Sequence, residues 1–330
     1  MLRFFRSSNS IVILAVLLIG GLAWVHVLFG ESETIPSDQY GSFAYRMFYN
    51  WLIDTTVLNA WISLVLFLLT AILLIYVNSQ LRLIDKISYL PALCYIMLIG
   101  GIPETHVFNP AIIASILLIA GFIFLVKSFD SERLSYEYLI VPIFISTAMF
   151  FYQYMYVYML VVWLAIALWR PGYWREWVFS ILGFALPLFF AFSWSFLVED
   201  DYTRLGDFFS GMFTVQRIIP SLSIHTICFS ALYVVLAIIA FGYMLRYLSS
   251  RKIIIRNGYY IIVLIAVITV GLILVIPDTF PFIWYILAFP MSFIMSYYLA
   301  AIKSERLGEI LLLLFFGSVI AAQAIYLSIV

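Results

Sequence analysis

Long apolar stretches separated by short polar gaps fill almost the whole chain. A membrane-spanning helix needs about 20 apolar residues, with a range of about 17–25. We therefore predict an all-α, polytopic helical membrane protein, because only helices and closed barrels satisfy their backbone hydrogen bonds in lipid and these runs are too long for barrel strands. The apolar runs are Ile11–Phe29, Val57–Val77, Ile87–Ile102, Pro110–Val126, Leu139–Trp169, Val178–Leu197, Ile224–Leu245, Tyr259–Ile276, Ile283–Ala301 and Ile310–Val330.

The fifth run, Leu139–Trp169, decides the number of spans. As one helix it would be about 46 Å long at 1.5 Å per residue, well beyond the apolar core of a bilayer. A hairpin that turns near Phe151–Gln153 would supply two spans instead, for a total of eleven. A nine-span alternative keeps the long run single and excludes Ile87–Ile102, a short run that contains Pro91.

The distribution of Lys and Arg favours the hairpin, because cytoplasmic loops of membrane proteins carry an excess of both. With a cytoplasmic amino terminus, the hairpin puts fourteen of the 17 basic residues inside and three outside. One long span would give eight and nine, and the nine-span arrangement twelve and five. We predict eleven spans, with the carboxyl terminus periplasmic. The inside residues are Arg3, Arg6, Arg82, Lys86, Lys127, Arg133, Arg170, Arg175, Arg246, Arg251, Lys252, Arg256, Lys303 and Arg306, and the outside residues are Arg46, Arg204 and Arg217.

Composition supports one integral membrane domain over residues 1–330. The chain is 65% hydrophobic and 10% charged, with a mean hydropathy of +1.11, whereas soluble domains are about 25% charged. The longest polar gaps, the predicted external loops 30–56 and 198–223, are too short for a soluble domain. Arg3 and Arg6 precede a first run without a small-residue cleavage site, so we expect an uncleaved first helix.

The predicted external face collects the unusual residues, including His26, His106 and His225. In loop 30–56, Asp38 stands before a stretch whose aromatic residues have the spacing of one helical face, which is typical of a helix lying in the membrane interface. Asp38 has two interpretations. It caps that helix through backbone N–H groups, or it holds a carboxylate at membrane level beside a lipid headgroup, and one residue can do both.

Loop 198–223 repeats this layout. Asp200 and Asp201 precede an apolar helical face, and they fit the first turn of an interfacial helix, where the helix dipole favours acids. Arg204 and Arg217 flank that face. Because planar guanidinium groups match phosphate, these two arginines and Arg46 are candidates for binding a lipid phosphate.

A third candidate is the short turn around Glu104 and His106. Its carboxylate and imidazole, two residues apart, could share a metal or a proton, although such a pair in a Pro/Gly-rich segment can also be only a turn. The chain has no phosphate-binding glycine loop, nucleophile elbow, or zinc or haem pattern, so the cofactor is unknown and a divalent metal stays open. Charges are nearly absent from the span centres, which argues against an ion-driven carrier.

The segment Asp38-Gln-Tyr-Gly-Ser-Phe-Ala-Tyr-Arg46 resembles the first external loop of the C-type glycosyltransferase (GT-C) superfamily. That superfamily consists of integral enzymes that use polyprenyl-phosphate-linked sugars and carry a catalytic Asp in this loop. The resemblance implies that Asp38 is the catalytic residue. The chain departs from the pattern at Gln39, where many members have a second acid.

A second segment, Trp169-Arg-Pro-Gly-Tyr-Trp-Arg-Glu-Trp177 followed by Gly183 and Pro187, resembles an uncharacterised multi-pass inner-membrane family of Bacteroidetes. Its members share an Arg-Pro-x-x-x-Arg-Glu-Trp loop that enters a Gly-x-x-x-Pro helix. The resemblance implies a membrane protein with no assigned activity.

Our leading hypothesis is a GT-C-like enzyme that transfers a sugar from a polyprenyl phosphate at the periplasmic face of the bacterial inner membrane. Asp38 would be the general base, with Arg46, Glu104, His106, Arg204 and Arg217 binding substrate. We expect membrane lipid as a partner and no nucleic acid. The alternatives are a transporter or flippase of lipid-linked material and a non-enzymatic scaffold subunit of a cell-envelope assembly.

Overall fold

The computed structural model describes residues 2–6, 9–25, 27, 56–84, 88–130, 136–198, 224–280, 282–302 and 304–329. Of the described residues, 87% are helical and none is in a strand. The first helices are α1 (Leu2–Phe5), α2 (Ser10–Ala23), α6 (Thr56–Leu81), α7 (Leu90–Gly100), α8 (Pro110–Lys127), α9 (Glu137–Met149) and α10 (Met159–Trp169). The later helices are α11 (Trp174–Val198), α13 (Ile224–Leu248), α14 (Ile253–Val275), α15 (Trp284–Ala301) and α16 (Glu305–Ile329). Short 3₁₀ turns are η1 (Pro103–Thr105), η2 (Ser128–Asp130), η3 (Gln153–Tyr158) and η4 (Pro277–Thr279).

Seven of the described helices are long and apolar enough to cross a membrane, and four shorter apolar helices accompany them. The seven are α6, α8, α11, α13, α14, α15 and α16. The protein is therefore a multi-pass helical membrane protein, as its hydropathy predicts. The number of crossings and the sides of the termini stay predictions.

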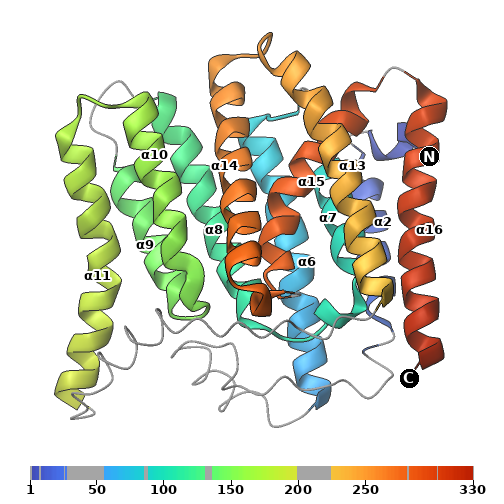
Figure 1. The fold of residues 1–330 in the computed structure, drawn as a ribbon, viewed down its shortest axis with the longest axis horizontal. Helices are drawn as coiled ribbons and strands as arrows, with labels where there is room; N and C mark the ends of the chain where they lie inside the picture. The colour runs from blue at the N-terminus through green and yellow to red at the C-terminus, as the bar shows by residue number, and fades with distance from the viewer. Residues whose placement is uncertain are drawn as a thin grey trace.

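The long apolar run Leu139–Trp169 forms two helices. The helix α9 ends at Met149, and the chain resumes in η3 at Gln153 and continues as α10. The two legs pack against each other and turn back within the bundle (Figure 1). This break is where the hairpin interpretation requires it.

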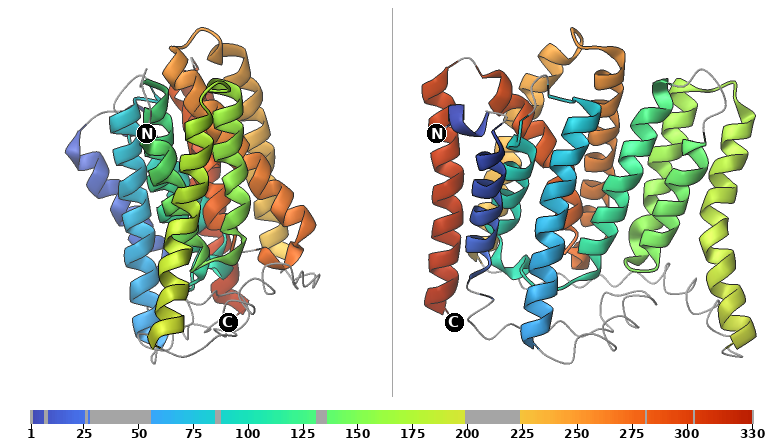
Figure 2. Two further views of the ribbon diagram at one scale, coloured as in Figure 1. Left: turned by 90° about the vertical axis from the view of Figure 1, so that its left-hand side faces the viewer. Right: turned by 180° about the vertical axis from the view of Figure 1, so that it is seen from behind.

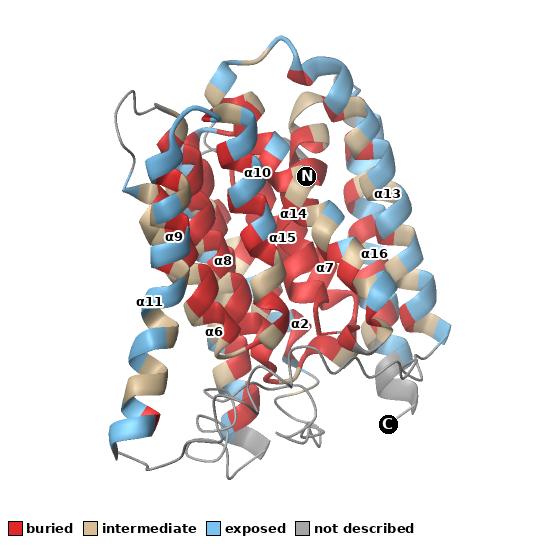
Figure 3. Ribbon diagram, turned by 60° about the vertical axis from the view of Figure 1, so that its left-hand side comes forward, coloured by how far each residue is buried: buried red, intermediate tan, exposed pale blue. Residues whose placement is uncertain are grey.

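The centre of the bundle is the pair α7 and α15. Every residue of α7 is buried, and α15 packs against α7, α8, α13 and α14. Figure 2 shows α9, α10 and α11 on one flank, and Figure 3 shows exposed residues concentrated on the outer helices α11, α13 and α16. Apolar side chains such as Phe189, Phe190 and Trp194 on α11 are more than 60% exposed, which fits a surface that faces lipid.

Two ends of the bundle can be distinguished (Figure 1). The end that holds the carboxyl ends of α6, α8, α10, α13 and α15 also holds the amino terminus, and we call it the basic end. The other end, the loop end, holds the carboxyl ends of α2, α7, α9, α11 and α14. Segments 28–55 and 199–223 both attach at the loop end, since α2 and α11 end there and α6 and α13 begin there.

At the basic end, a buried ion pair joins α10 to α11. Arg170 donates from Nη1 to Glu176 Oε1 at 2.7 Å and from Nη2 to the carbonyl of Ser128 at 3.0 Å. The side chain of Glu176 is fully buried and that of Arg170 is 9% exposed. The guanidinium carbon also lies 5.5 Å from the ring centroid of Tyr173. The Arg-Pro-x-x-x-Arg-Glu-Trp loop is thus held by its own first Arg and its Glu.

Gly183 explains how α11 approaches α9 so closely. A Cβ at this position would overlap the carbonyl oxygen of Leu139 and lie 3.1 Å from its carbonyl carbon. Because backbone atoms cannot swing aside as a flexible side chain can, only glycine allows this contact. Leu139 is in the first turn of α9, so the contact also belongs to the basic end.

Candidate functional site

The carboxyl end of α7 lies inside the loop end of the bundle. An 11-residue helix is only about 16 Å long, and the last carbonyls of any helix lack intrahelical partners. Side chains from elsewhere donate to three of these carbonyls. They are Trp284 Nε1 to Leu98 O at 3.1 Å, His106 Nε2 to Ile99 O at 3.1 Å, and Gln323 Nε2 to Gly100 O at 2.9 Å.

The turn that follows, residues 101–109, is mostly buried and held in the same way. Tyr285 Oη donates to the carbonyl of Thr105 at 2.9 Å, and the Phe108 N–H donates to Asn59 Oδ1 at 3.2 Å. Asn109 then caps α8 by accepting from the backbone N–H groups of Ala111 and Ile112. Irregular backbone at membrane depth is tolerated where it is buried in protein, and this turn meets that condition.

His106 belongs to this buried framework. Its ring stacks on Trp24, with centroids 4.0 Å apart, and Trp24 stacks in turn on Phe67 at 4.6 Å. His106 is fully buried. Because the carbonyl of Ile99 can only accept a hydrogen bond, His106 Nε2 carries the proton. His106 therefore connects the turn directly to α7 and to the end of α2, and Trp24 continues the contact to α6.

Glu104, two residues earlier, reaches the surface of the loop end. Its Oε1 lies 4.0 Å from Nε2 of His225, and the side chains are 25% and 10% exposed, respectively. His225 is the second residue of α13, so it comes directly after segment 199–223. A half-buried carboxylate beside an imidazole offers hydrogen-bond acceptors and a ring nitrogen to a ligand that carries hydroxyl groups.

The structure describes only some of the predicted site residues. Glu104 and His106 lie in the α7–α8 turn at the loop end, whereas Asp38, Arg46, Arg204 and Arg217 lie outside the described residues. The helices that precede and follow their segments, α2, α6, α11 and α13, have the adjoining ends at the loop end. The attachment points of both loops and the Glu104–His225 pair therefore share one end of the molecule.

The partner of Glu104 could not be read from the sequence. Proximity along the chain pairs Glu104 with His106, but the structure brings His225 beside Glu104 from a distant helix. The available signal was the position of His225 on the predicted external face, at the end of loop 198–223. Which histidine meets the carboxylate depends on how α13 packs beside the turn.

Within the part of the chain that the structure describes, no group of three or more His, Cys, Asp or Glu side chains could hold a metal ion. The described part of the site is an acid–imidazole pair formed by Glu104, on the mostly buried turn, and His225, on α13. In comparisons with known proteins, the chain matches no protein family, no curated protein and no solved structure. The resemblances to the GT-C superfamily and to the Bacteroidetes family stay predictions.

Proposed function

We propose that this protein is a GT-C-like membrane glycosyltransferase that moves a sugar from a polyprenyl phosphate to a hydroxyl acceptor. The observation that carries the proposal is the convergence at the loop end. The Glu104–His225 pair lies 4.0 Å apart at the same end where segments 28–55 and 199–223 attach. A membrane enzyme of this class needs polar catalytic groups at one end of an apolar bundle, within reach of a lipid headgroup.

The proposed reaction breaks the bond between the sugar C1 and the phosphate oxygen and forms a bond between C1 and the acceptor oxygen. The acceptor proton passes to the Asp38 carboxylate, and polyprenyl phosphate leaves with the electron pair of the broken bond. Arg46, Arg204 and Arg217 stabilise the charge that develops on the departing phosphate. No part of this assignment requires a titratable group in the middle of the membrane.

Glu104 and His225 would bind the sugar. An ionised carboxylate only accepts hydrogen bonds, which suits sugar hydroxyls, and the neighbouring imidazole can donate or accept. Donors from α15 and α16 bind the backbone carbonyls of Thr105 and Gly100, on either side of Glu104, and so hold the backbone that carries the carboxylate. We assign His106 to this supporting framework through its stack on Trp24.

The test is sugar transfer by the purified protein in liposomes from a radiolabelled polyprenyl-phosphate sugar to a membrane acceptor. Asp38→Asn keeps the capping oxygen but cannot take a proton at neutral pH, so we expect a loss of about 100-fold or more with unchanged thermal stability. Glu33→Gln neutralises another acid of the same segment and is the matched control, which should retain wild-type transfer.

Wild-type transfer by Asp38→Asn would refute the catalytic assignment and leave Asp38 as a helix cap. If the wild-type protein transfers no sugar but moves the labelled lipid across the bilayer, the protein is a flippase. If it does neither with any polyprenyl-linked sugar tried, the enzyme proposal fails.

A further inference from the structure

One aromatic side chain of α13 packs against the start of the turn that carries Glu104. Most of α13 is exposed or half-buried, as Figure 3 shows, so its position in the bundle depends on a few inward-facing residues. Tyr233 is the largest of these and is wholly buried. The buried residues of α13 are Thr226, Tyr233, Ala240, Met244 and Leu248.

The ring of Tyr233 lies on Gly101, the first residue of the turn. A Cβ at Gly101 would overlap the hydroxyl oxygen of Tyr233 and lie 2.7 Å from its Cζ and 2.8 Å from its Cε2. The backbone of Gly101 has φ −82° and ψ −1°, a conformation that other residues adopt in ordinary turns. Glycine is therefore required here for space, because the tyrosine ring packs directly on the backbone of the turn.

Contacts from α16 hold this ring in place. Ser318 donates its hydroxyl hydrogen to the carbonyl of Phe315 at 2.7 Å, so Tyr233 is the donor in the 3.0 Å bond between Tyr233 Oη and Ser318 Oγ. The ring also stacks on Phe315, with centroids 5.8 Å apart and planes 14° apart. Gln323 of the same helix donates to the carbonyl of Gly100. The helix α16 thus binds both the ring and the backbone on which the ring packs.

The helix α13 therefore meets the turn at two points. At the first, Tyr233 packs on Gly101. At the second, about 12 Å away along the helix axis, His225 Nε2 lies 4.0 Å from Glu104 Oε1. Because two points fix the height and the rotation of a rigid helix, a change at the first point moves the side chain at the second.

We propose that Tyr233 is a positioning residue, whose packing on Gly101 places His225 beside Glu104. Its part in catalysis rests on the proposed function, in which Glu104 and His225 bind the sugar, but the geometry can be measured without any activity. A close-packed interior transmits such a constraint, since the ring cannot shift without losing its contacts with α16 and the turn.

The first experiment measures the approach of the two site residues by cross-linking. Glu104→Cys and His225→Cys are combined in a background without Cys94 and Cys228, the two native cysteines. A short bifunctional thiol reagent then joins the new pair in the detergent-purified protein. Tyr233→Leu removes the ring atoms that pack on the turn, and we expect it to slow this cross-linking about fivefold or more.

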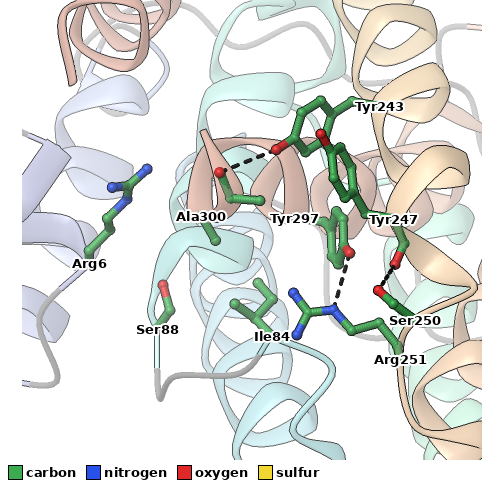
Figure 4. Close-up of a pocket in the computed structure, with 10 residues that line it drawn as sticks. Arg6, Ile84, Ser88, Tyr243, Tyr247, Ser250, Arg251, Tyr297 and Ala300 are labelled. Carbon is green, nitrogen blue, oxygen red and sulfur yellow. Dashed lines mark hydrogen bonds between the residues drawn. The ribbon is translucent and has the colours of Figure 1, made fainter. Parts of the chain in front are cut away.

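A second tyrosine of α13 supplies the matched control. Figure 4 shows Tyr243 at the basic end, where its hydroxyl donates to the carbonyl of Ala301 at 3.3 Å. Tyr243→Leu removes a ring from the same helix far from the turn, so it should change the cross-linking rate less than about twofold.

A second pair of variants tests the contact from the side of the turn. Gly101→Ala puts a methyl group into the space of the ring, and it should slow the cross-linking about fivefold or more when Tyr233 is present. In the Tyr233→Leu background it should slow the reaction less than about twofold further, because both changes remove one contact. Gly121→Ala is the matched control and should leave the rate unchanged, since its new methyl group would lie in ordinary contact, 3.5 Å from Phe144 Cβ.

Two results would overturn the inference. One is that Tyr233→Leu slows the cross-linking no more than Tyr243→Leu, and the other is that Gly101→Ala slows it no more than Gly121→Ala. If Tyr233→Leu does not yield folded protein, the two glycine variants decide alone, by the same criterion.

Sugar transfer, measured on proteins that keep Glu104 and His225, separates this inference from the proposed function. Tyr233→Leu should raise KM for the polyprenyl-phosphate sugar about fivefold or more and change kcat less than about twofold, since the displaced pair binds the sugar in the ground and transition states alike. Slower cross-linking in a protein that transfers no sugar supports the positioning role and counts against the transferase. Sugar transfer with cross-linking that Tyr233→Leu leaves unchanged supports the transferase and overturns the positioning role.

Discussion

Different kinds of side chain hydrogen-bond to the polar groups at the two ends of this bundle. At the basic end, charged side chains supply the hydrogen bonds. Arg6 donates to the carbonyl of Ile302, Arg170 to the carboxylate of Glu176, and Arg251 to the hydroxyl of Tyr297. At the loop end, neutral donors from Trp284, Tyr285 and Gln323 satisfy the carbonyls of α7 and its turn. Positive charge therefore stabilises one end, and neutral hydrogen bonds stabilise the other.

The difference follows the distribution of charge along the chain. All Lys and Arg residues within the described ranges lie in connections or helix turns of the basic end. Such a bias orients a membrane protein during insertion, and here the same residues also hold the structure together. The loop end has no described Lys or Arg side chain, and its carboxylate Glu104 lies beside the imidazole of His225.

The largest expected effect is on the unfolding free energy, when one acid at each end is neutralised in turn. Glu176→Gln removes the carboxylate charge that faces the buried guanidinium of Arg170, and we expect it to cost about 3–5 kcal/mol of unfolding free energy. Glu104→Gln alters a partly exposed pair and should cost less than about 1 kcal/mol. Denaturant unfolding in detergent, followed by tryptophan fluorescence, measures both.

A double variant serves as the control for this contrast. Arg170→Met combined with Glu176→Leu removes both charges, and should recover most of the stability lost in Glu176→Gln. Equal costs for Glu176→Gln and Glu104→Gln would show that the basic end does not depend on its ion pair.

A smaller effect should come from the close contact between α9 and α11. In Gly183→Ala the new methyl group would overlap the Leu139 carbonyl, and we expect a loss of about 1–3 kcal/mol as the helices move apart. Gly242→Ala, in a helix with nothing within 4 Å of the new methyl group, is the matched control and should be neutral or slightly stabilising. Thermal unfolding of both variants distinguishes packing from helix propensity, and similar melting temperatures would argue against the close approach.

Sequence patterns predict the helical membrane class and the break in Leu139–Trp169, because span length and loop charge are local properties. They do not predict that the run Ile87–Ile102 ends its helix at Gly100 inside the bundle. That end is stabilised by donors outside the helix, among them Trp284 and Gln323 from distant helices, which hydrogen-bond to its carbonyls. The site shows the same limit, since Glu104 could be recognised by its type and position but its partner His225 is fixed by tertiary packing.

The central claim is that the basic end faces the cytoplasm and the loop end faces outward, where the proposed chemistry takes place. Single cysteines at Ser249, an exposed residue of the basic end, and at Ser42, in the segment between α2 and α6, test it most directly. The background lacks Cys94 and Cys228, the two native cysteines. We predict that a membrane-impermeant maleimide labels Ser42→Cys in intact spheroplasts and Ser249→Cys only after lysis. Labelling of Ser249→Cys in intact spheroplasts would contradict the orientation and, with it, the placement of the active end.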